Sequence, residues 1–544
     1  MIETQSQPSP STDSAIGRRG LLALPLAAVA AACGPSSTTT APATTTSAAG
    51  GGSEVTTTPA PTSTSTIAPA PSVVELTAKR ENPELHLAKR ATFGATPEVV
   101  ESIVGLGRAT WLEQQLQPAG LDTGAVDAKI STLPALAITD PSESLAVYLQ
   151  TQQAPQARLQ LQLATVIRAV ESPAQLYERM VEFWSDHFNV PADGNYLGVM
   201  RHHLDLDLRE HALGRFKDLV VAVTRSPAMM EYLDNYKSRA GAINENFARE
   251  LLELHTVGVD GPYNEADVVD TARLLTGWTM LRRQGRFAFA DRLHDDGAVD
   301  IMGWTRPAGS DHEQHGVDFL HWLAVHPDTA AFVCTKLARR FVSDDPSPEL
   351  VSAMTNTWLA GDSEIAPVLR TMFEHDEFGA AAGAKFNRPL DFTYSLLRRL
   401  QADITPTTGT GELRAIALAL EALGQIPMTW PSPDGFPDTE AAWLNTGALL
   451  NRWNFIGDVV AGATGAVSFD GASFVADLAG SDATTIFESL AQRLTMQPLT
   501  TAGHALLESF TGWSGPDVPD ATQLGETLPL VAVALLGSGQ EMYR

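Results

Sequence analysis

Apolar positions from about residue 74 onward recur every three or four residues, the spacing that places them on one side of a helix. Thr96-Pro97-Glu98 marks a helix start, because an oxygen-bearing side chain caps the first turn and proline fits its first position. The same spacing predicts helices over 145–180 with a break at Ser172-Pro173, and over 327–341, 349–359, 365–373, 389–400 and 528–536. Alternating β-branched runs are nearly absent, and 287–290 is the best strand candidate. We therefore predict an all-α fold, a large multi-helix body over 74–544 with long irregular loops at 284–314 and 429–439.

The stretch 244–278 holds the most regular arrangement of ionisable groups, on two predicted helices joined by a polar loop. A step of about 100° per residue puts Arg249, Glu250 and Glu253 together on the polar side of the first helix. Spacing alone favours an ordinary surface pair between Arg249 and Glu253, worth about 0.3–0.5 kcal/mol. Glu250 borders the apolar side, where partial burial would raise its pKa and make it a usable acid or base. His255 falls among apolar residues, so we expect a core histidine there.

The loop between these two helices has two interpretations. Its acidic and amide side chains suggest a calcium loop, but the alternating ligand positions and the distal glutamate of an EF-hand are missing. Asn264 with Asp267 three residues later fits a helix cap with its reciprocal partner. The cap is the preferred interpretation.

The first 32 residues are predicted to be a signal peptide. Arg18 and Arg19 precede an apolar run over 21–32 that is too short to span a bilayer, and adjacent arginines suggest the twin-arginine export route. Small residues directly before Cys33 resemble a lipobox, whose cysteine is lipidated; a plain signal peptide with an incidental cysteine is the alternative. Residues 33–73 are mostly Thr, Ser, Ala, Pro and Gly, which predicts a disordered tether. The expected location is the cell surface, at the outer face of the cytoplasmic membrane, with the lipid as the only membrane contact.

The net charge and the number of cysteines exclude some classes of partner and some kinds of chemistry. The formal net charge is −27, and it does not change when residues 1–32 are removed, since two acidic and two basic residues leave together. Affinity for a phosphate backbone depends on Lys and Arg displacing counterions, so we expect no nucleic-acid partner. Apart from Cys33 the only cysteine is Cys334, which lies among apolar residues at helical spacing. We predict a buried structural thiol there and no disulfide within the mature body.

Three histidine clusters are candidates for chemistry, because imidazole and carboxylate groups together can ligate a metal ion or form an acid–base pair. They are Asp186-His187 among aromatic residues, His294-Asp295 in the long loop, and the segment 201–207 with its paired histidines. The segment 201–207 is predicted to be a mostly solvated helix face. None of the clusters has the two-His helical spacing of a zinc protease, so scattered loop histidines are the preferred interpretation.

Long segments of the chain are similar to one family. NENFARELLELHTVGVDG, followed by EADV and ARLLTGW, resembles the core signature of the domain of unknown function numbered 1800 (DUF1800). Other segments that fit the same family are HLAKRATFGATPE, FWSDHFNV, the HDDG loop, HPDTAAFVCTKLARRFV, KFNRPLDF and LGQIPMTWPSPDGFPD, so the resemblance covers about 83–544. It implies a helical exported protein, encoded beside an exported sulfatase-like partner, and it does not name a reaction. The positions on recurring motifs are His187, Glu245, Arg249, Glu250, Glu253, Asp267, Arg273, Trp278, His294 and Lys336.

Two functional hypotheses follow from these groups. The first is a hydrolase that acts on an ester, a phosphoester or a glycoside at the cell surface. Its catalytic residues would be Glu250 as general base, Glu253 and His187 as acid partners, Arg249 as the binder of an anionic group, and His294 from the loop. If a divalent metal ion takes part, its ligands would be Glu250, Glu253, His187, His294 and Asp295.

The second hypothesis is a surface-anchored binding or assembly protein, in which the same groups form a buried polar network that fixes helix packing. The contact surface would then be the 429–443 region, where we expect Trp430, Phe436 and Trp443 to be exposed. The two hypotheses differ in one geometric requirement. The hydrolase needs His187, Glu250, Glu253 and His294 to converge on one cavity.

Overall fold

Helices build the body of the protein, which confirms the all-α prediction. The computed structural model describes residues 75–78, 82–309, 312–462 and 464–544. The predicted signal peptide, Cys33 and the linker up to residue 73 lie outside the described residues. Within the described ranges, no helix has the length and apolar character needed to cross a bilayer.

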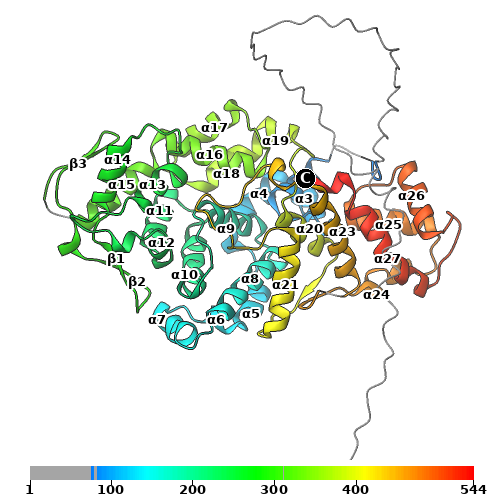
Figure 1. Cartoon of the computed structure of the whole chain (residues 1–544). Coiled ribbons are helices and arrows are strands. Elements are labelled where there is room, and N and C mark those ends of the chain that lie inside the picture. The colour runs from blue at the N-terminus through cyan, green and yellow to red at the C-terminus, as the bar shows by residue number, and fades with distance from the viewer. Residues whose placement is uncertain (1–74, 79–81, 310–311, 463) are drawn as a thin grey trace, which may run out of the picture.

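The first part of the chain forms a set of packed helices that ends with α12 (Figure 1). They are α2 (Pro83–Ala91), α3 (Pro97–Leu106), α4 (Arg108–Leu116), η2 (Pro118–Gly120), α5 (Gly124–Ser131), α6 (Pro134–Ala137), α7 (Pro141–Ser144), the π-helical turn η3 (Leu145–Leu149), α8 (Ala154–Glu171), α9 (Gln175–His187), α10 (Asn195–His211), α11 (Phe216–Arg225) and α12 (Pro227–Tyr232). Thr96 caps α3 as predicted, since its side chain accepts a hydrogen bond from the backbone N–H of Val99. The expected break at Ser172-Pro173 separates α8 from α9.

The signature stretch and the long loop after it form the next part. Their elements are η4 (Asn235–Lys237), α13 (Asn246–Glu250), the π-helical turn η5 (Leu251–His255), α14 (Glu265–Leu274), β1 (Trp278–Leu281), β2 (Arg286–Phe289), η6 (Asp291–Leu293), β3 (Val299–Ile301) and β4 (Trp304–Arg306). β1 pairs with β2 and β3 with β4, both antiparallel, so the loop 284–314 is partly ordered into two hairpins and the strand expected at 287–290 is confirmed. Asn264 and Asp267 cap α14 reciprocally, which confirms the cap interpretation.

The second half of the chain returns to helices at the predicted places. Its elements are α15 (His312–Ala324), α16 (Pro327–Phe341), α17 (Pro348–Ala360), α18 (Ile365–Glu374), α19 (Asp376–Ala380), α20 (Pro389–Arg399), β5 (Asp403–Ile404), α21 (Thr410–Leu423), α22 (Glu440–Trp443), α23 (Thr446–Val460), β6 (Val467–Ser468), α24 (Gly471–Phe474), η7 (Ala476–Leu478), α25 (Ala483–Thr495), α26 (Thr501–Thr511), α27 (Ala521–Leu536) and η8 (Gly539–Met542). The loop 429–439 is irregular, as predicted.

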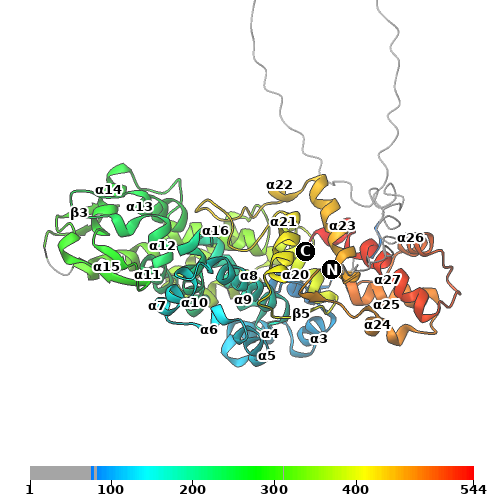
Figure 2. The ribbon, with the colours of Figure 1, turned by 60° about the horizontal axis from the view of Figure 1, so that its bottom comes forward.

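Two hydrophobic clusters form the interior. The first is built mainly from α2–α4 and α9–α18, and the second from α8, α20, α21, α23, α25 and α27. In both ribbon views, α13–α15 lie at one end of an elongated body and α24–α27 at the other, with α9 and α20 between them (Figures 1 and 2). Polar groups on α9 and α20 therefore lie where the two clusters meet.

Helix α10 differs from the prediction in its segment 201–207. Arg201, His202, His203 and Asp205 are buried, so the expectation of a solvated face is wrong. The reason is that α10 packs against α8, α11 and α12, and these neighbours cover its charged side. Burial lowers the pKa of His202 to about 4 and that of His203 to about 3, because a low-dielectric surrounding favours the neutral imidazole.

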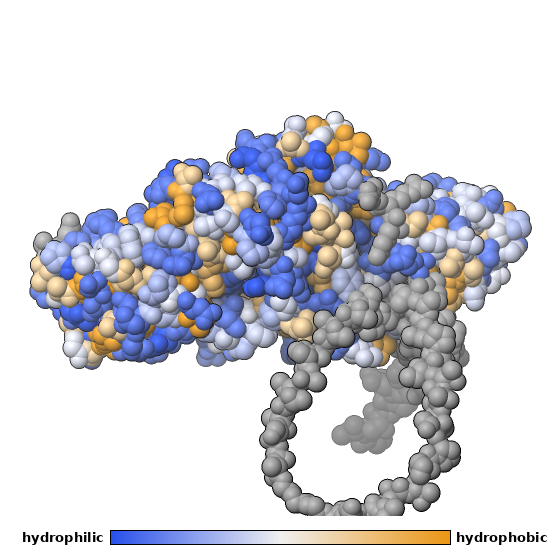
Figure 3. Space-filling view, turned by 90° about the horizontal axis from the view of Figure 1, so that it is seen from above, coloured by the Kyte–Doolittle hydropathy of each residue, from blue (hydrophilic) through white to orange (hydrophobic). Residues whose placement is uncertain are grey.

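The surface carries apolar residues only in small groups on the face drawn in Figure 3, where hydrophilic residues separate them. Exposed apolar side chains such as Val104, Val259 and Leu418 come from different helices and loops. Apolar residues scattered in this way are normal for a protein surface and do not by themselves mark an interface.

Candidate functional site

Helix α9 places a row of carboxylates at the junction of the two hydrophobic clusters. Glu178, Glu182 and Asp186 follow one another at intervals of four, so they share one side of the helix. Met180 and Trp184 lie on a different side and are fully buried in the first cluster. The apolar packing of α9 thus fixes where its carboxylates point.

Two of these carboxylates belong to a set that we call the central charge cluster: Arg179, Glu182, Asp186, Arg340, Arg388, Asp391, Asp438 and Arg544. Arg340 from α16 and Arg388 at the start of α20 both donate to Oδ2 of Asp186, at 2.8 and 3.1 Å. Arg388 also donates to Glu182, with Nη2 2.8 Å from Oε1. Asp438, which lies in the loop 429–439, forms an ion pair with Arg340. The cluster therefore joins α9, α16, α20 and this loop by ion pairs.

Asp391 forms ion pairs with three arginines, two of which, Arg388 and Arg179, also donate hydrogen bonds to it. Arg388 Nε lies 2.8 Å from Oδ2, and Arg544 Nη1 and Arg179 Nη1 lie 2.8 and 3.1 Å from Oδ1. Burial alone would raise the pKa of Asp391, but the three guanidinium groups hold it well below its usual range. Because the side chain is only 1% exposed, its charge is compensated by these partners and not by water.

Asp186 has a different electrostatic balance. Burial and the neighbouring Glu182 raise the pKa of Asp186 to about 6, although Arg340 and Arg388 act in the opposite direction. Both arginines use Oδ2, and among the described residues none donates a hydrogen bond to Oδ1. One oxygen of this carboxylate is therefore available to another group.

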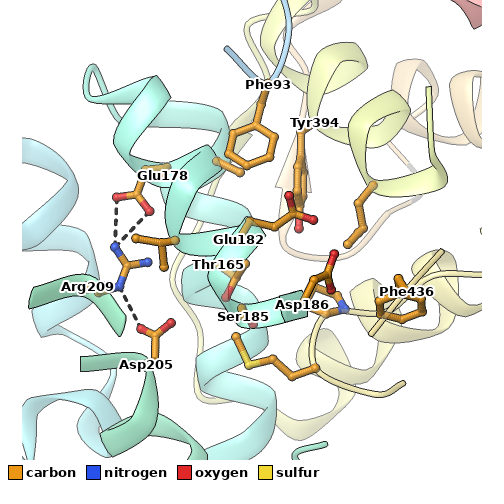
Figure 4. A pocket seen from close by; sticks show the side chains of 15 residues that line it. Phe93, Thr165, Glu178, Glu182, Ser185, Asp186, Asp205, Arg209, Tyr394 and Phe436 are labelled. Carbon is orange, nitrogen blue, oxygen red and sulfur yellow. Dashed lines mark hydrogen bonds and ion pairs between the residues drawn. The ribbon is translucent and has the colours of Figure 1, made fainter. Parts of the chain in front are cut away.

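A small cavity adjoins Asp186 (Figure 4). Its polar lining includes Glu178, Glu182, Ser185, Asp186, Asp205, Arg209 and the hydroxyl-bearing Thr165 and Tyr394. The cavity measures about 30 Å³, counted as the space open to the centre of a water molecule. One water needs roughly 10–15 Å³ on this measure, so the cavity has room for about two waters or a group of similar size.

Glu178 and Asp205 share Arg209 as an ion-pair partner on the far side of this cavity. Arg209 Nη1 lies 3.0 Å from Glu178 Oε2, and its Nε lies 2.8 Å from Asp205 Oδ2. Figure 4 shows this pairing on one side and Tyr394, Asp186 and Phe436 on the other. The side formed by Asp186 and Tyr394 is therefore the one with more polar groups left for a ligand to contact.

The loop 429–439 covers α9 beside the cavity. Asn189 Nδ2 donates to the carbonyl oxygens of Trp430 and Ser432, at 2.8 and 2.6 Å. Gly435 has a φ of +76°, and a Cβ at this position would collide with the backbone carbonyl oxygen of Asp186. The loop can lie this close to the helix only because residue 435 is glycine.

The exposed aromatic contact surface expected at 429–443 is absent from this region. Phe436 and Trp443 are 8% and 9% exposed, and Trp430 is half-buried with its ring 5.1 Å from that of Phe436. The prediction is wrong because the loop folds back onto α9 and the second hydrophobic cluster, where these rings become part of the interior.

The signature residues lie on α13 and η5 as a surface group. Arg249 pairs with Glu253 and Glu245, each at 3.6 Å, and more closely with Glu265 of α14, at 3.2 Å. The expected Arg249–Glu253 pair is thus confirmed. Burial, helped by Glu253, raises the pKa of Glu250, as its border position predicts.

His187 and His255 are core residues, each 1% exposed. His187 Nε2 donates to the backbone carbonyl oxygen of His255 at 3.0 Å. Burial and the nearby Lys336 hold the pKa of His187 well below its ordinary value and lower that of His255 to about 3. Both imidazoles are therefore neutral at physiological pH, and the core prediction for His255 is confirmed.

His294 and Asp295 are held within their own loop. His294 Nδ1 donates to the carbonyl oxygen of Thr276 at 2.8 Å, while Nε2 accepts from Arg306 Nη1 at 2.9 Å. Asp295 Oδ1 lies 3.0 Å from Arg273 Nη2. These contacts tie the HDDG loop to α14 and β4, so the predicted site residues of the loop have structural partners.

Across the ranges that the structure describes, no three or more His, Cys, Asp and Glu side chains are grouped as ligands of a metal ion. The residues proposed for a divalent metal, Glu250, Glu253, His187, His294 and Asp295, therefore do not form such a group. Glu250 and Glu253 lie in the surface group of α13 and η5, His187 lies in the core, and His294 and Asp295 contact residues of their own loop and its neighbours.

Sequence reasoning missed most of the central charge cluster. Glu182, Arg340, Arg388, Asp391 and Asp438 come from four separate segments, and no spacing along the chain relates Asp186 to Arg388. One local signal was present: Arg340 stands in α16 at helical spacing with the apolar residues Val333 and Leu337. A cation at such a position is costly to bury unless it is paired, which indicates partners elsewhere.

The family comparison agrees with the matched segments. The family model described as protein of unknown function (DUF1800) matches residues 86–541. The chain belongs to the DUF1800 family. No curated protein and no solved structure matches the chain. In this DUF1800 body the signature over 244–278 lies at one end, with most of its charged residues at the surface. Other matched segments supply residues of the central charge cluster: FWSDHFNV holds Asp186, KFNRPLDF holds Arg388 and Asp391, and the segment ending in GFPD holds Asp438.

Proposed function

We propose that the protein is exported, is anchored by a lipid on Cys33 at the outer face of the cytoplasmic membrane, and acts at the cell surface as a binding or assembly protein. Arg18-Arg19, the short apolar run and the small residues before Cys33 support export and lipidation. The Ser/Thr/Pro-rich linker over 33–73 would hold the body away from the membrane.

The observation that carries the binding hypothesis is that the buried ionisable groups form ion pairs with one another. In the central charge cluster, arginines and carboxylates pair mainly with one another and join elements from both hydrophobic clusters. A network of this kind specifies helix packing, because any other arrangement would leave buried charges unpaired. Most of the groups first considered for catalysis have structural partners as well, such as Arg306 for His294 and Arg249 for Glu253.

The size of the cavity supports the same proposal. A site of about 30 Å³ accepts the end of a small group and excludes a sugar ring or a polymer segment. The partner of the assembly would be a protein, for which the family resemblance implies an exported sulfatase-like partner. The net charge of −27 disfavours nucleic acid.

A second candidate function, a surface hydrolase, is favoured by one observation. Burial lowers the pKa of Lys336 to about 8, and burial with Glu182 raises that of Asp186 to about 6. An acid and a base that titrate on either side of neutral pH could exchange a proton during a reaction. In this hypothesis Lys336 and Asp186 take the catalytic roles that were first given to Glu250 and His294.

The test compares anchoring with activity. We expect the wild-type protein in the membrane fraction and Cys33→Ala in the soluble exported fraction, and crosslinking at the surface should capture a protein partner. Purified wild type, Glu250→Gln and Lys336→Met are screened with ester, phosphoester and glycoside substrates, together with metal analysis. Substrate turnover that is lost in Lys336→Met would overturn the binding proposal in favour of the hydrolase. Soluble wild-type protein would overturn the anchor.

A further inference from the structure

The hydroxyl of Tyr394 is the starting observation. The residue is 0% exposed, and its Oη has no hydrogen-bond partner among the described residues. Buried hydroxyl groups normally have a partner, because burying one without a partner is unfavourable. Tyr394 lines the cavity beside Asp186, and Figure 4 shows its ring directed toward the carboxylates of α9.

A second polar group that lines the same cavity is the carboxylate of Asp186. Its Oδ2 oxygen accepts from both Arg340 and Arg388, whereas Oδ1 accepts no hydrogen bond from a described residue. Tyr394 and Asp186 come from α20 and α9, so the two helices together line the cavity with one hydroxyl and one carboxylate group.

The remaining wall of the cavity is apolar and partly aromatic. Phe93, Leu390, Met428 and Phe436 contribute it, and Phe93 and Tyr394 stack edge to face with ring centroids 5.1 Å apart. Aromatic faces attract cations, and methylene groups pack well against such side chains. The wall therefore suits a short alkyl chain that ends in a charged group.

We propose that this cavity binds the ammonium end of an alkylamine, either a free amine or the side chain of a lysine in a partner protein. The ammonium would donate to Asp186 Oδ1 and Tyr394 Oη, and its first methylene groups would contact Met428 and Phe436. The assignment names the ligand chemistry of the site and rests on the proposed binding function.

Charge and size distinguish an ammonium group from other small ligands. The carboxylate of Asp186 lines the cavity and would repel an anion placed there, although Arg340 and Arg388 pair with its other side. A neutral alcohol could use the same hydrogen bonds but would add no charge attraction to the carboxylate of Asp186. Room for about two waters corresponds to the nitrogen and one or two carbons, which excludes the bulky quaternary ammonium of choline.

The experiment is a titration of the purified full chain at pH 7.5 with ethylammonium and, separately, with ethanol, followed by ligand-observed NMR. A ligand of three non-hydrogen atoms binds with a Kd no lower than about 0.5 mM, so this method is suited to the affinity. We expect binding of ethylammonium and none of ethanol. A short peptide with one lysine, compared with the same peptide containing norleucine, distinguishes a protein side chain from a free amine as the source.

Two variants and one control locate the binding. Tyr394→Phe removes only a hydroxyl without a partner, so the fold should be unaffected while affinity falls by roughly tenfold, as expected for a hydrogen bond to a charged group. Asp186→Asn should abolish binding, with folding checked by circular dichroism. Tyr263→Phe is the matched control, since its hydroxyl bonds to Val259 O on the surface, and it should bind like wild type.

The pH profile gives a further readout. The charged and titratable groups that act on Asp186 are Glu182 on α9, Arg201 on α10, Lys336 and Arg340 on α16, and Arg388 and Tyr394 on α20. Binding should weaken as pH falls through about 6, where Asp186 becomes protonated. The amine itself keeps its proton throughout this range, because alkylammonium groups titrate near 10.4.

The outcomes that overturn the proposal are specific. They are equal binding of ethanol and ethylammonium, unchanged affinity in folded Tyr394→Phe, or no binding of either amine or lysine peptide. If a surface partner is captured by the wild-type protein while no amine binds, only this ligand assignment fails. If ethylammonium binds as expected but no partner is captured and the protein is soluble, the ligand assignment stands and the anchored-assembly proposal fails.

Discussion

Arg388 and Asp391 stand one helical turn apart at the start of α20, with Arg388 Nε 2.8 Å from Asp391 Oδ2 and both side chains 1% exposed. The pair is local, yet each member has further partners from distant segments, including Glu182 for Arg388 and Arg544 for Asp391. The junction of the two hydrophobic clusters is thus held by ion pairs that lie away from solvent.

Removing one carboxylate from this set should be strongly destabilising. In Asp391→Asn, three arginines lose their common partner while remaining buried, and breaking a buried ion pair in this way costs about 3–5 kcal/mol. The free energy of unfolding from urea titration measures the effect. Asp458→Asn, at an exposed position of α23, is the control and should change stability by less than about 0.5 kcal/mol. A loss of similar size in both variants would contradict a special role for the cluster.

The raised pKa of Asp186 should make its contribution to the free energy of unfolding decrease as pH rises. Its folded-state pKa is raised to about 6, so its contribution to stability is complete below the ordinary pKa and is lost as pH rises through 6. Asp391 acts oppositely: its lowered pKa adds stability at neutral pH that is lost in acid. We expect the carboxyl carbon of Asp186 to titrate near pH 6 in NMR spectra of aspartate-labelled protein, with the signal assigned by Asp186→Asn. A midpoint near 4 would disprove the argument.

Arg306 should be the residue that keeps the HDDG loop in place. Arg306→Ala removes its hydrogen bonds to His294 Nε2 and to the carbonyl oxygens of Asp295 and Gly297, and the groups left behind are buried or half-buried. We expect a loss of about 2–4 kcal/mol and faster amide hydrogen exchange over 294–306. Arg292→Ala, at an exposed position of the same loop, is the control. Unchanged exchange in Arg306→Ala would show that β3 and β4 alone order the loop.

Thiol titration tests the state of both cysteines. Cys334 is 0% exposed and burial raises its pKa to about 12, so it should react with a thiol reagent only after unfolding. If Cys33 is lipidated, protein isolated from membranes shows no reactive thiol in the native state and one after denaturation, since the chain has two cysteines. A reactive thiol in the native membrane protein would argue against lipidation.

The helices were predictable because their signals are local. The apolar spacing over 327–341 and the reciprocal cap of Asn264 and Asp267 depend on residues a few positions apart, and the structure has both. The burial of His202 was not predictable, since a charged helix face looks the same whether water or three other helices cover it.

The candidate site was predictable only in part for the same reason. The sequence drew attention to Asp186-His187 and to the loop 429–439, but Asp186 and Arg388 are 202 positions apart and no pattern of a single chain connects them. Conversely, Glu250 and His294 looked catalytic because ionisable residues crowd around them in sequence. In the fold, His294 Nε2 accepts a hydrogen bond from Arg306, and Glu250 is a half-buried member of the surface group on α13.

Gly435 has a consequence for how this family can diverge. The carbonyl oxygen of Asp186 occupies the space that any side chain at 435 would need, so this position is closed to substitution as long as the loop rests on α9. We expect related chains to exchange the exposed residues around it freely while keeping the glycine. In a relative without this glycine, the loop must lie farther from the helix. The residue at position 435 would therefore indicate which members of the family have this cavity.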